Sequence, residues 1–412
     1  MQSDVVIIGA GIAGSTAALL FARQNIRVAV IEKKQRVSDY KKLCTHFIQP
    51  SALPVIKRLQ LDSAIEMAGG LPNKADIWTK AGWIRSGDEY HYGEGMQHGY
   101  NIERRILDPL LRNLLCNEPG IQYIPGSTVK EIHTSSPQAH RISYLNNSGQ
   151  HMELEARLVV AADGRFSEMA TLLDNEGSVL LNNRFVCFAY FRHVALSSGG
   201  HSQFWTLDPD MAFAYPLQKD ITLICLFIKK TEWQSWKKQL EKNFISYINN
   251  LHDGPGMEKA TRISNIHCML EMPNITRPAV KNGVAFIGDA ALALDPMSGV
   301  GCGFAFQSAE WLVDHTCKAL LDHNDLDSAL QSYKEYHEAR LLPHAAGIHA
   351  DSLAESDDGS KLQLYNEIVQ DPELTDAFLA LTGRIITPQA FFALYLKKKL
   401  RKRKQPIYPD QQ

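Results

Sequence analysis

The sequence lacks the features that mark several large classes of protein. Its seven cysteines are widely spread and include no Cys-x-x-Cys pair, so we expect neither a disulfide framework nor a metal site. The formal net charge of −2 gives no overall attraction to nucleic acid. No apolar run approaches the roughly 20 residues that span a bilayer, and the first residues lack the basic segment of a signal peptide. These absences indicate a cytoplasmic protein.

The chain does have enough apolar sequence for two or three lobes. Hydrophobic residues make up 45% of its 412 residues, and single domains usually hold about 100–200 residues. Residues 121–157 alternate in polarity around a turn at residues 146–149, which predicts an antiparallel ribbon. Buried strands of a parallel sheet are predicted at residues 4–8, 27–31, 158–162 and 284–287.

The second half of the chain has a different pattern. Aromatic and β-branched strands are predicted at residues 185–193 and 221–228, and an amphipathic helix is predicted over residues 233–251. Later still, helices are predicted over residues 304–321 and 326–340. The chain therefore combines a parallel sheet, a second aromatic sheet and a helical end.

A glycine motif follows the first predicted strand. Residues 9–14 fit G-x-G-x-x-G between a strand and a helix, where the second glycine, Gly11, allows close approach of a pyrophosphate. The helix start offers free N–H groups to the phosphates. Glu32 ends the second strand, where a carboxylate accepts hydrogen bonds from a ribose. The motif predicts a dinucleotide site without separating NAD from FAD, and the expected contacts are Gly9, Gly11, Ile12, Ala13, Gly14, Glu32 and Lys33.

A second motif, far along the chain, favours FAD. The strand at 284–287 delivers Asp289, and a short loop leads to a glycine-rich helix start. A dehydrogenase that binds only NAD does not need this element. In FAD, Asp289 would bind the ribityl hydroxyls, and the helix start would face the flavin pyrimidine edge, where reduced flavin carries negative charge. The expected contacts here are Asp289, Pro296, Gly299, Val300, Gly301 and Cys302.

The two motifs together resemble those of the flavoprotein monooxygenases related to para-hydroxybenzoate hydroxylase, and of the geranylgeranyl reductases and flavin-dependent halogenases. The resemblance spans residues 4–340. Residues 104–108 are similar to the family's R-x-x-L-D stretch, which implies that Arg104 lies beside the flavin. Residues 161–167 are similar to its A-D-G-x-x-S stretch, which implies that Asp163 helps to bind the cofactor.

The resemblance implies a discontinuous α/β fold. We expect a Rossmann-like FAD-binding domain of the glutathione-reductase type, with a parallel sheet and an inserted antiparallel ribbon. We also expect an α+β substrate domain with a mixed or antiparallel sheet, followed by C-terminal helices. The expected ranges are 1–70, 98–180 and 276–340 for the FAD domain, 71–97 and 181–275 for the substrate domain, and 341–412 for the C-terminal helical region.

Family consensus residues are replaced at several positions of this chain. Ala170 stands where the family usually has arginine, and Leu292 where it has histidine. Gly303 and Ser308 replace its usual Asn and Asp. The expected electron donor is NADH or NADPH, with a partner reductase as the alternative.

The resemblance implies flavin redox chemistry but leaves the reaction open. We expect a monooxygenase that uses molecular oxygen and a flavin C4a-hydroperoxide to hydroxylate or epoxidise an aromatic, polyketide or prenylated small molecule. The alternatives are a reductase of prenyl double bonds, a halogenase, and an FAD-bearing binding or sensor protein. The W-x-W-x-I-P run typical of flavin-dependent halogenases is absent from the sequence.

Substrate residues are expected on the second lobe and on the loop after the second strand. Residues 211–216 resemble the family's aromatic-Pro strand that faces the flavin, so Phe213, Tyr215 and Gln49 are candidate substrate contacts. The catalytic candidates are His46, for proton transfer, and Tyr215, for orienting the substrate. For each, the alternative is a packing or backbone-bonding role. Covalent flavin attachment at Cys44 or His46 is a further possibility.

The C-terminal segment combines apolar and basic residues. Residues 391–396 are apolar or aromatic, and seven cations follow within residues 397–404. This pattern is typical of peripheral contact with an anionic membrane, which would suit a lipophilic substrate. The alternative is a solubilising end after a helix that packs on the body.

Overall fold

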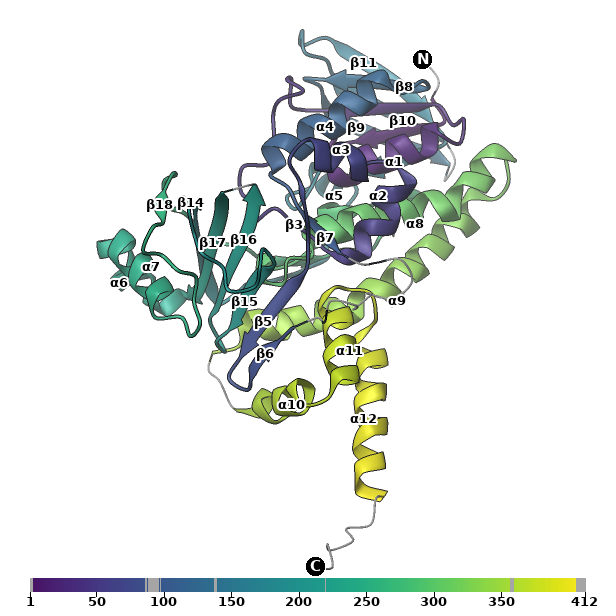
Figure 1. Cartoon of the computed structure of the whole chain (residues 1–412). Coiled ribbons are helices and arrows are strands. Elements are labelled where there is room, and N and C mark those ends of the chain that lie inside the picture. Colours follow the sequence, from purple (N-terminus) through teal and green to yellow (C-terminus); the bar gives the residue numbers. More distant parts are fainter. Residues whose placement is uncertain are drawn as a thin grey trace, which may run out of the picture.

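The computed structural model describes residues 3–85, 87, 96, 98–136, 139–218, 220–355 and 359–404. An α/β body, a second sheet and a group of C-terminal helices lie side by side (Figure 1). The mixed α/β class that we expected is confirmed.

A six-stranded sheet forms the centre of the body. Its order is β21-β22-β12-β1-β2-β8, and every neighbouring pair is parallel except β21–β22. The inner strands are rich in Val, Ile and Ala and are buried on both faces, as in parallel sheets covered on both sides. The strands are β1 (Val5–Ile8), β2 (Val28–Glu32), β8 (Ile121–Pro125), β12 (Leu158–Ala161), β21 (Val280–Lys281) and β22 (Val284–Phe286).

An antiparallel ribbon covers one face of this sheet. It consists of β9 (Thr128–Ser136), β10 (Ala139–Leu145) and β11 (His151–Ala156), with the predicted turn between the last two. The ribbon was predicted to begin at residue 121. This start was wrong, because residues 121–125 form β8, which pairs with β2 in the parallel sheet. An edge strand is only half-buried, so its sequence alternates like that of an antiparallel strand.

Helices cover the other face of the central sheet. Alternate side chains of the sheet point toward these helices and toward the ribbon, so each face has its own apolar core. The helices α1 and α8 pack against each other directly. The helices of the body are α1 (Ile12–Ala22), α2 (Leu53–Arg58), α3 (Asp62–Met67), α4 (Arg104–Asn117), α5 (Glu168–Leu172) and α8 (Gly301–Leu321).

The second sheet has eight strands in the order β18-β14-β17-β16-β15-β5-β6, with β19 beside β14. Only β5 and β15 pair in parallel, so the sheet is mixed, as expected. Its inner face turns toward the body and its outer face packs on two helices (Figure 1). The strands are β5 (Ala75–Thr79), β6 (Gly82–Ile84), β14 (Arg184–Arg192), β15 (Ser202–Thr206), β16 (Met211–Gln218), β17 (Ile221–Lys229), β18 (Thr261–Arg262) and β19 (His267–Met269).

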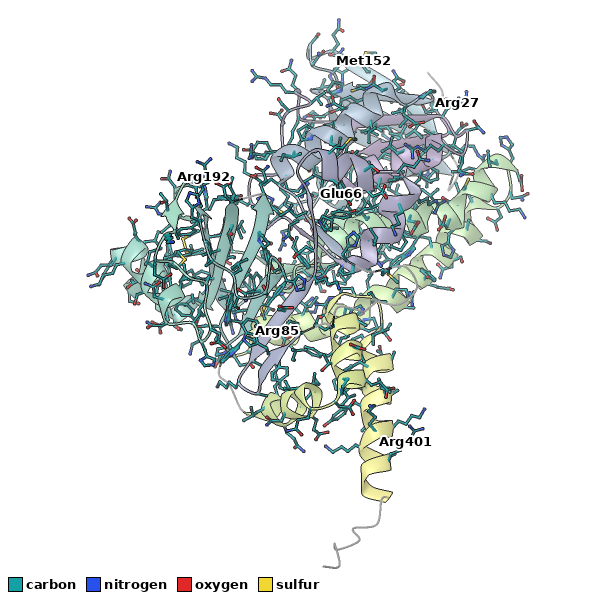
Figure 2. The ribbon with its side chains drawn as sticks, in the orientation of Figure 1. Arg27, Glu66, Arg85, Met152, Arg192 and Arg401 are labelled. Atoms are coloured by element: carbon teal, nitrogen blue, oxygen red, sulfur yellow. A yellow bond between two sulfur atoms is a disulfide. The ribbon has the colours of Figure 1, made fainter. Side chains whose placement is uncertain are left out.

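Two features of this lobe correct the sequence analysis. The helix predicted over residues 233–251 is broken into α6 (Trp233–Trp236) and α7 (Leu240–Asn249), because Gln239 between them leaves helical geometry at φ −140° and ψ 51°. A disulfide joins Cys187 and Cys268 (yellow bond in Figure 2). These two cysteines are 81 residues apart and face each other only because β14 pairs with β19.

Small sheets connect the two lobes. One comprises β3 (Phe47–Ile48), β7 (Gly99–Asn101) and β4 (Leu71–Asn73). The other comprises β13 (Ser178–Leu180), β20 (Asn274–Thr276) and β23 (Leu292–Ala293). Both position loops of the body against the second sheet.

Four helices end the chain. The first of them, residues 326–353, continues past the end predicted at residue 340 and contains Pro343. The last helix points away from the body (Figure 1). No helix of the described residues has both the length and the apolar character to cross a bilayer. The helices are α9 (Leu326–Leu353), α10 (Ser360–Val369), α11 (Pro372–Thr382) and α12 (Pro388–Lys404).

Candidate active site

The turn between β1 and α1 is shaped by three glycines with different roles. Gly9 has φ +105°, and a Cβ on it would lie 2.5 Å from the carbonyl oxygen of Ala162. A Cβ on Gly14 would lie 1.9 Å from the oxygen of Gly9. A Cβ on Gly11 would meet nothing within 4 Å, and Gly11 caps α1 without a side chain. The turn therefore leaves open space directly in front of the first N–H groups of α1.

The carboxylate of Glu32 is fixed beside this turn. It accepts hydrogen bonds from Ala10 N (2.6 Å) and Lys34 N (2.9 Å), one on each oxygen. Each oxygen keeps a lone pair for a further donor. The ammonium of Lys33 instead lies 3.9 Å from the carboxylate of Glu168, and both side chains are largely exposed. The structure thus brings Glu32, but not the end of the Lys33 side chain, to the glycine turn.

The start of α8 offers a second set of free backbone donors. A 3-10 turn over Pro296–Ser298 leads into Gly299 at φ +63°, and α8 begins at Gly301 with no side-chain cap and no acid in its first turn. A Cβ on Gly299 would lie 3.3 Å from the ring of Phe47, and Gln49 binds the carbonyl oxygen of Ser298 (3.2 Å). The loop after β2 is therefore held directly against this helix start.

Asp289 lies between the two backbone surfaces. Its carboxylate is 3.0 Å from the ammonium of Lys41, and its Oδ1 would be 3.7 Å from a Cβ on Gly301. Burial alone would raise the pKa of Asp289, but Lys41 and then Arg165 outweigh it and hold the pKa below its ordinary value. Asp289 is therefore ionised at the start of α8.

Arg104 begins α4 and is buried against Asp108 at 2.5 Å. The other oxygen of Asp108 accepts a hydrogen bond from Lys41 N (2.9 Å). Burial opposes the charge of Arg104, but Asp108 and nearby thiols raise its pKa, so this arginine stays cationic. Asp108 thus links α4 to the loop after β2 through the backbone of Lys41.

His46 is held by hydrogen bonds at both ring nitrogens. Nδ1 accepts from Arg104 N (3.1 Å), so the ring proton of the neutral imidazole is on Nε2, which donates to the hydroxyl of Tyr190 (2.6 Å). His46 has φ +70°, an uncommon backbone conformation for a residue with a side chain. The ring thus bonds the backbone at Arg104 N, which is the alternative to a catalytic role, and proton transfer by His46 stays a prediction.

Two thiols meet beside these groups. The side chains of Cys44 and Cys302 are hydrogen-bonded to each other, and Cys44 Sγ also accepts from His46 N (3.4 Å). The hydrogen bond from Cys302, then the contact with His46 and the charge of Arg104, lower the pKa of Cys44 well below its ordinary value. The partner thiol, Cys302, has its pKa raised by the same hydrogen bond and by burial.

The inner face of the second sheet forms an aromatic wall against this region. Tyr215 stacks on Phe47 (ring centroids 5.4 Å apart) and on Phe213 (5.4 Å), and Phe204 packs on all three. The hydroxyl of Tyr215 is buried and has no hydrogen-bond partner among the described residues. Burial raises the pKa of Tyr215 well above its ordinary value, so the hydroxyl keeps its proton. A buried hydroxyl without a partner is uncommon in an apolar wall, and contact of Tyr215 with a substrate stays a prediction.

Asp163 has a different environment from the other predicted cofactor residues. Its two oxygens accept hydrogen bonds from Ser167 Oγ (2.6 Å) and Met169 N (3.0 Å), at the start of α5. These bonds make it an anchor of that helix, and burial raises its pKa. A direct contact of Asp163 with the cofactor stays a prediction.

Sequence reasoning missed several side chains of the site. Lys41, Asp108 and Tyr190 come from three segments that only the fold brings together. Asp108 had a local signal, since it lies four residues after Arg104 on one helix face. Lys41 and Tyr190 had none, because their partners are 248 and 144 residues away in the sequence.

The family of the chain follows from a comparison with known proteins. A family model described as an FAD binding domain matches residues 2–343. The chain belongs to the FAD-binding-domain family. Its cofactor is therefore FAD, and it is a flavin-dependent enzyme of the group that includes monooxygenases, halogenases and reductases.

Individual members of this family are distant relatives. Phenazine 1,6-dicarboxylic acid hydroxylase PhzS of Lysobacter antibioticus is 25% identical over 93% of this chain and 96% of its own length. Digeranylgeranylglycerophospholipid reductase of Picrophilus torridus is 22% identical over 81% of this chain and 82% of its own. The solved structure of flavin-dependent brominase Bmp2 superposes with a TM-score of 0.75 at 17% identity, covering 98% of this chain and 100% of that one. At this identity the superposition establishes the fold alone.

The residues present fit FAD. The space before Gly11 is open to a pyrophosphate, and α1 and α8 both begin without side-chain caps. Such free helix starts suit the phosphates and the electron-rich edge of a reduced flavin. Glu32 lies against the glycine turn before α1, and Asp289 lies at the start of α8.

Proposed function

We propose that this protein is an FAD-dependent monooxygenase that hydroxylates or epoxidises an apolar small molecule of the aromatic, polyketide or prenylated class. The observation that carries the proposal is the buried aromatic wall of Phe47, Phe204, Phe213 and Tyr215 beside the start of α8, with an unpaired hydroxyl in it. Such a wall binds apolar surface and fixes its orientation through one polar contact. Bound FAD supplies the activation of oxygen, with NADH or NADPH as the electron donor.

The chain's own residues bind and orient the reactants. The N–H groups at the starts of α1 and α8 bind the pyrophosphate and the pyrimidine edge, Glu32 binds the ribose, and Asp289 binds the ribityl chain. Phe213, Tyr215 and Gln49 contact the substrate, and the aromatic wall excludes water. His46 donates its Nε2 proton in a hydrogen bond to the hydroxyl of Tyr190 and so fixes the orientation of that hydroxyl.

The three-part division expected from the sequence belongs to the same proposal. Residues 1–70, 98–180 and 276–340 hold FAD, and residues 71–97 and 181–275 cover the substrate. Residues 341–412 then form the C-terminal helical region. Limited proteolysis with and without FAD tests this division, since bound cofactor should protect the first set of segments selectively.

Isotope labelling tests the reaction. The holoenzyme is reduced by NADPH or NADH and exposed to ¹⁸O₂ with a panel of aromatic and prenylated compounds, and products are weighed by mass spectrometry. A monooxygenase gives a product that carries one ¹⁸O atom and forms none without oxygen. Product formed anaerobically and two hydrogens heavier would instead identify a reductase, and product that requires bromide or chloride would identify a halogenase. An FAD-bearing binder would give none of these products.

A second proposal concerns α12, which we infer touches an anionic membrane. Phe392, Leu396 and Leu400 are spaced by four residues and are 47%, 57% and 59% exposed, so they form an apolar stripe on one face. Exposed Lys397 and Arg401 flank this stripe, and Arg401 projects from the helix away from the body (Figure 2). Apolar and cationic residues together are typical of a helix that lies on an anionic bilayer.

Liposome sedimentation at low salt tests the membrane proposal. Leu396→Gln should reduce pelleting with phosphatidylserine vesicles about tenfold, because a buried leucine contributes roughly 1.5–3 kcal/mol. The control is Leu181→Gln, which changes an equally exposed leucine outside α12. Equal pelleting of the two variants, or none with the unaltered protein, would rule out this contact.

A further inference from the structure

A small cavity lies along α8 from Phe304 to Trp311, after its glycine-rich start. Its volume is about 170 Å³, room for five or six waters at roughly 30 Å³ each. It is lined by α8, by α9, by the loop between α11 and α12, and by Ser51, Pro54 and Met96. Its lining combines the basic side chains of Arg340, His344 and Arg384 with apolar side chains that include Phe304 and Trp311. This cavity takes no part in the proposed binding of FAD or in the proposed oxygenation.

The arginines of this cavity have no acidic partner. No described carboxylate lies within ion-pair distance of Arg340 or Arg384, although Glu310 also lines the cavity. The carboxylate of Glu310 is already engaged by Arg58 at 3.1 Å. Arg384 Nε is buried without a hydrogen-bond partner, and its Nη1 reaches only a ring nitrogen of His344 at 3.5 Å. A guanidinium whose buried Nε lacks a partner is incompletely satisfied.

The pKa directions of Arg384 and His344 agree with this lack of an acidic partner. Burial lowers the pKa of Arg384 to about 10, against a weaker opposing effect of Asp351. The pKa of His344 is lowered to about 3 by burial and then by the positive charges of Arg384 and Arg340. The imidazole is therefore neutral, and the field in the cavity is positive.

The backbone at Arg384 is also unusual. Arg384 N donates to Leu381 O and Ile385 N donates to Ala380 O, which together close α11 in a Schellman motif. The position with positive φ in this motif usually holds glycine, but here it is Arg384 at φ +62°, and the glycine stands one residue earlier as Gly383. The arginine thus occupies a backbone conformation that its side chain disfavours.

We propose that this cavity binds a small carboxylic acid. The carboxylate would pair with the guanidinium group of Arg384, whose planar arrangement of donors matches two carboxylate oxygens. Exposed Arg340, whose guanidinium lies over the ring of Tyr336 (5.5 Å to the ring centroid), would add positive charge nearby. The apolar part of the acid would pack on Phe304 and Trp311. A carboxylic acid fits better than a bare inorganic anion because half of the lining is apolar, and an inorganic ion would leave that half without contacts.

Calorimetry of the FAD-loaded protein with benzoate tests the proposal, with benzamide as the neutral compound of equal shape. Benzoate should bind once per chain and at least about tenfold more tightly than benzamide. Arg384→Met should weaken benzoate binding by about tenfold or more. Arg192→Met, on exposed Arg192 of the second sheet (Figure 2), is the matched control and should leave binding unchanged.

A second variant separates binding from folding. Arg384→Gly places the preferred residue at a positive φ and removes an unpaired cation, so the melting temperature should not fall while benzoate binding is lost. Equal affinity for benzoate and benzamide would overturn the proposal. The absence of detectable benzoate binding would also overturn it. So would benzoate binding that perturbs the flavin spectrum and persists in both Arg384 variants, since that result would place the acid at the active site.

Discussion

Substituting the glycines of the β1–α1 turn one at a time should separate cofactor binding from folding. Gly14→Ala places a Cβ 1.9 Å from the oxygen of Gly9, and neither backbone can move without disturbing the central sheet. This overlap should destabilise the apoprotein by at least about 3 kcal/mol. Gly11→Ala places its Cβ in open space at an ordinary φ of −77°. The apoprotein should therefore keep its stability to within about 1 kcal/mol.

The same Gly11→Ala change should weaken FAD binding severely. Its Cβ would occupy the space through which the pyrophosphate approaches the N–H groups of α1. Loss of two hydrogen bonds to a charged phosphate, at about 1.5–3 kcal/mol each, amounts to a Kd roughly 10²–10⁴-fold higher. Thermal unfolding of the apoproteins and fluorescence titration with FAD measure the two effects separately. Unchanged FAD affinity in Gly11→Ala, or an unfolded Gly11→Ala apoprotein, would refute this assignment of roles.

Three further substitutions test other parts of the structure. His337 is buried with neither ring nitrogen bonded, and burial lowers its pKa to about 4. As the pH falls, this histidine takes up a proton in the unfolded chain below about pH 6.5 but in the folded chain only below about pH 4. The free energy of unfolding therefore falls as the pH drops through this interval, and His337→Leu should remove about 3 kcal/mol of that loss, measured by urea unfolding. Tyr215→Phe should leave apoprotein stability equal or up to about 1 kcal/mol higher, but raise the KM for substrate, whereas a packing role alone would leave KM unchanged. Asp289→Asn should lower the free energy of unfolding by about 1 kcal/mol above pH 4, because the folded-state pKa of Asp289 is depressed. The difference from the unaltered protein should vanish as the pH falls through that pKa. A difference that does not change with pH would contradict the ion pair with Lys41.

The sequence predicted those parts of the fold that depend on local pattern. The strand, glycine turn, helix and strand at the N-terminus are contiguous, so their order and spacing carry the geometry of the turn. The start of α8 has the same property, since its loop and glycines follow β22 directly. Both backbone surfaces of the cofactor site were therefore predictable from short motifs.

Features that depend on distant pairing were not predictable in this way. The disulfide between Cys187 and Cys268 exists because two strands pair in one register, and no spacing rule encodes that register. The ion pair of Lys41 with Asp289 likewise joins two loops 248 residues apart. The extension of α9 beyond residue 340 was missed because Pro343 is a helix breaker by local preference, whereas packing of α9 on α8 outweighs that preference.

The account rests on FAD lying across two helix starts, and the flavin content of the purified chain tests this most directly. The apoprotein is titrated with FAD, and bound flavin is measured by its visible absorbance after gel filtration. We predict one tightly held flavin per chain. A folded apoprotein that takes up no flavin would contradict the account.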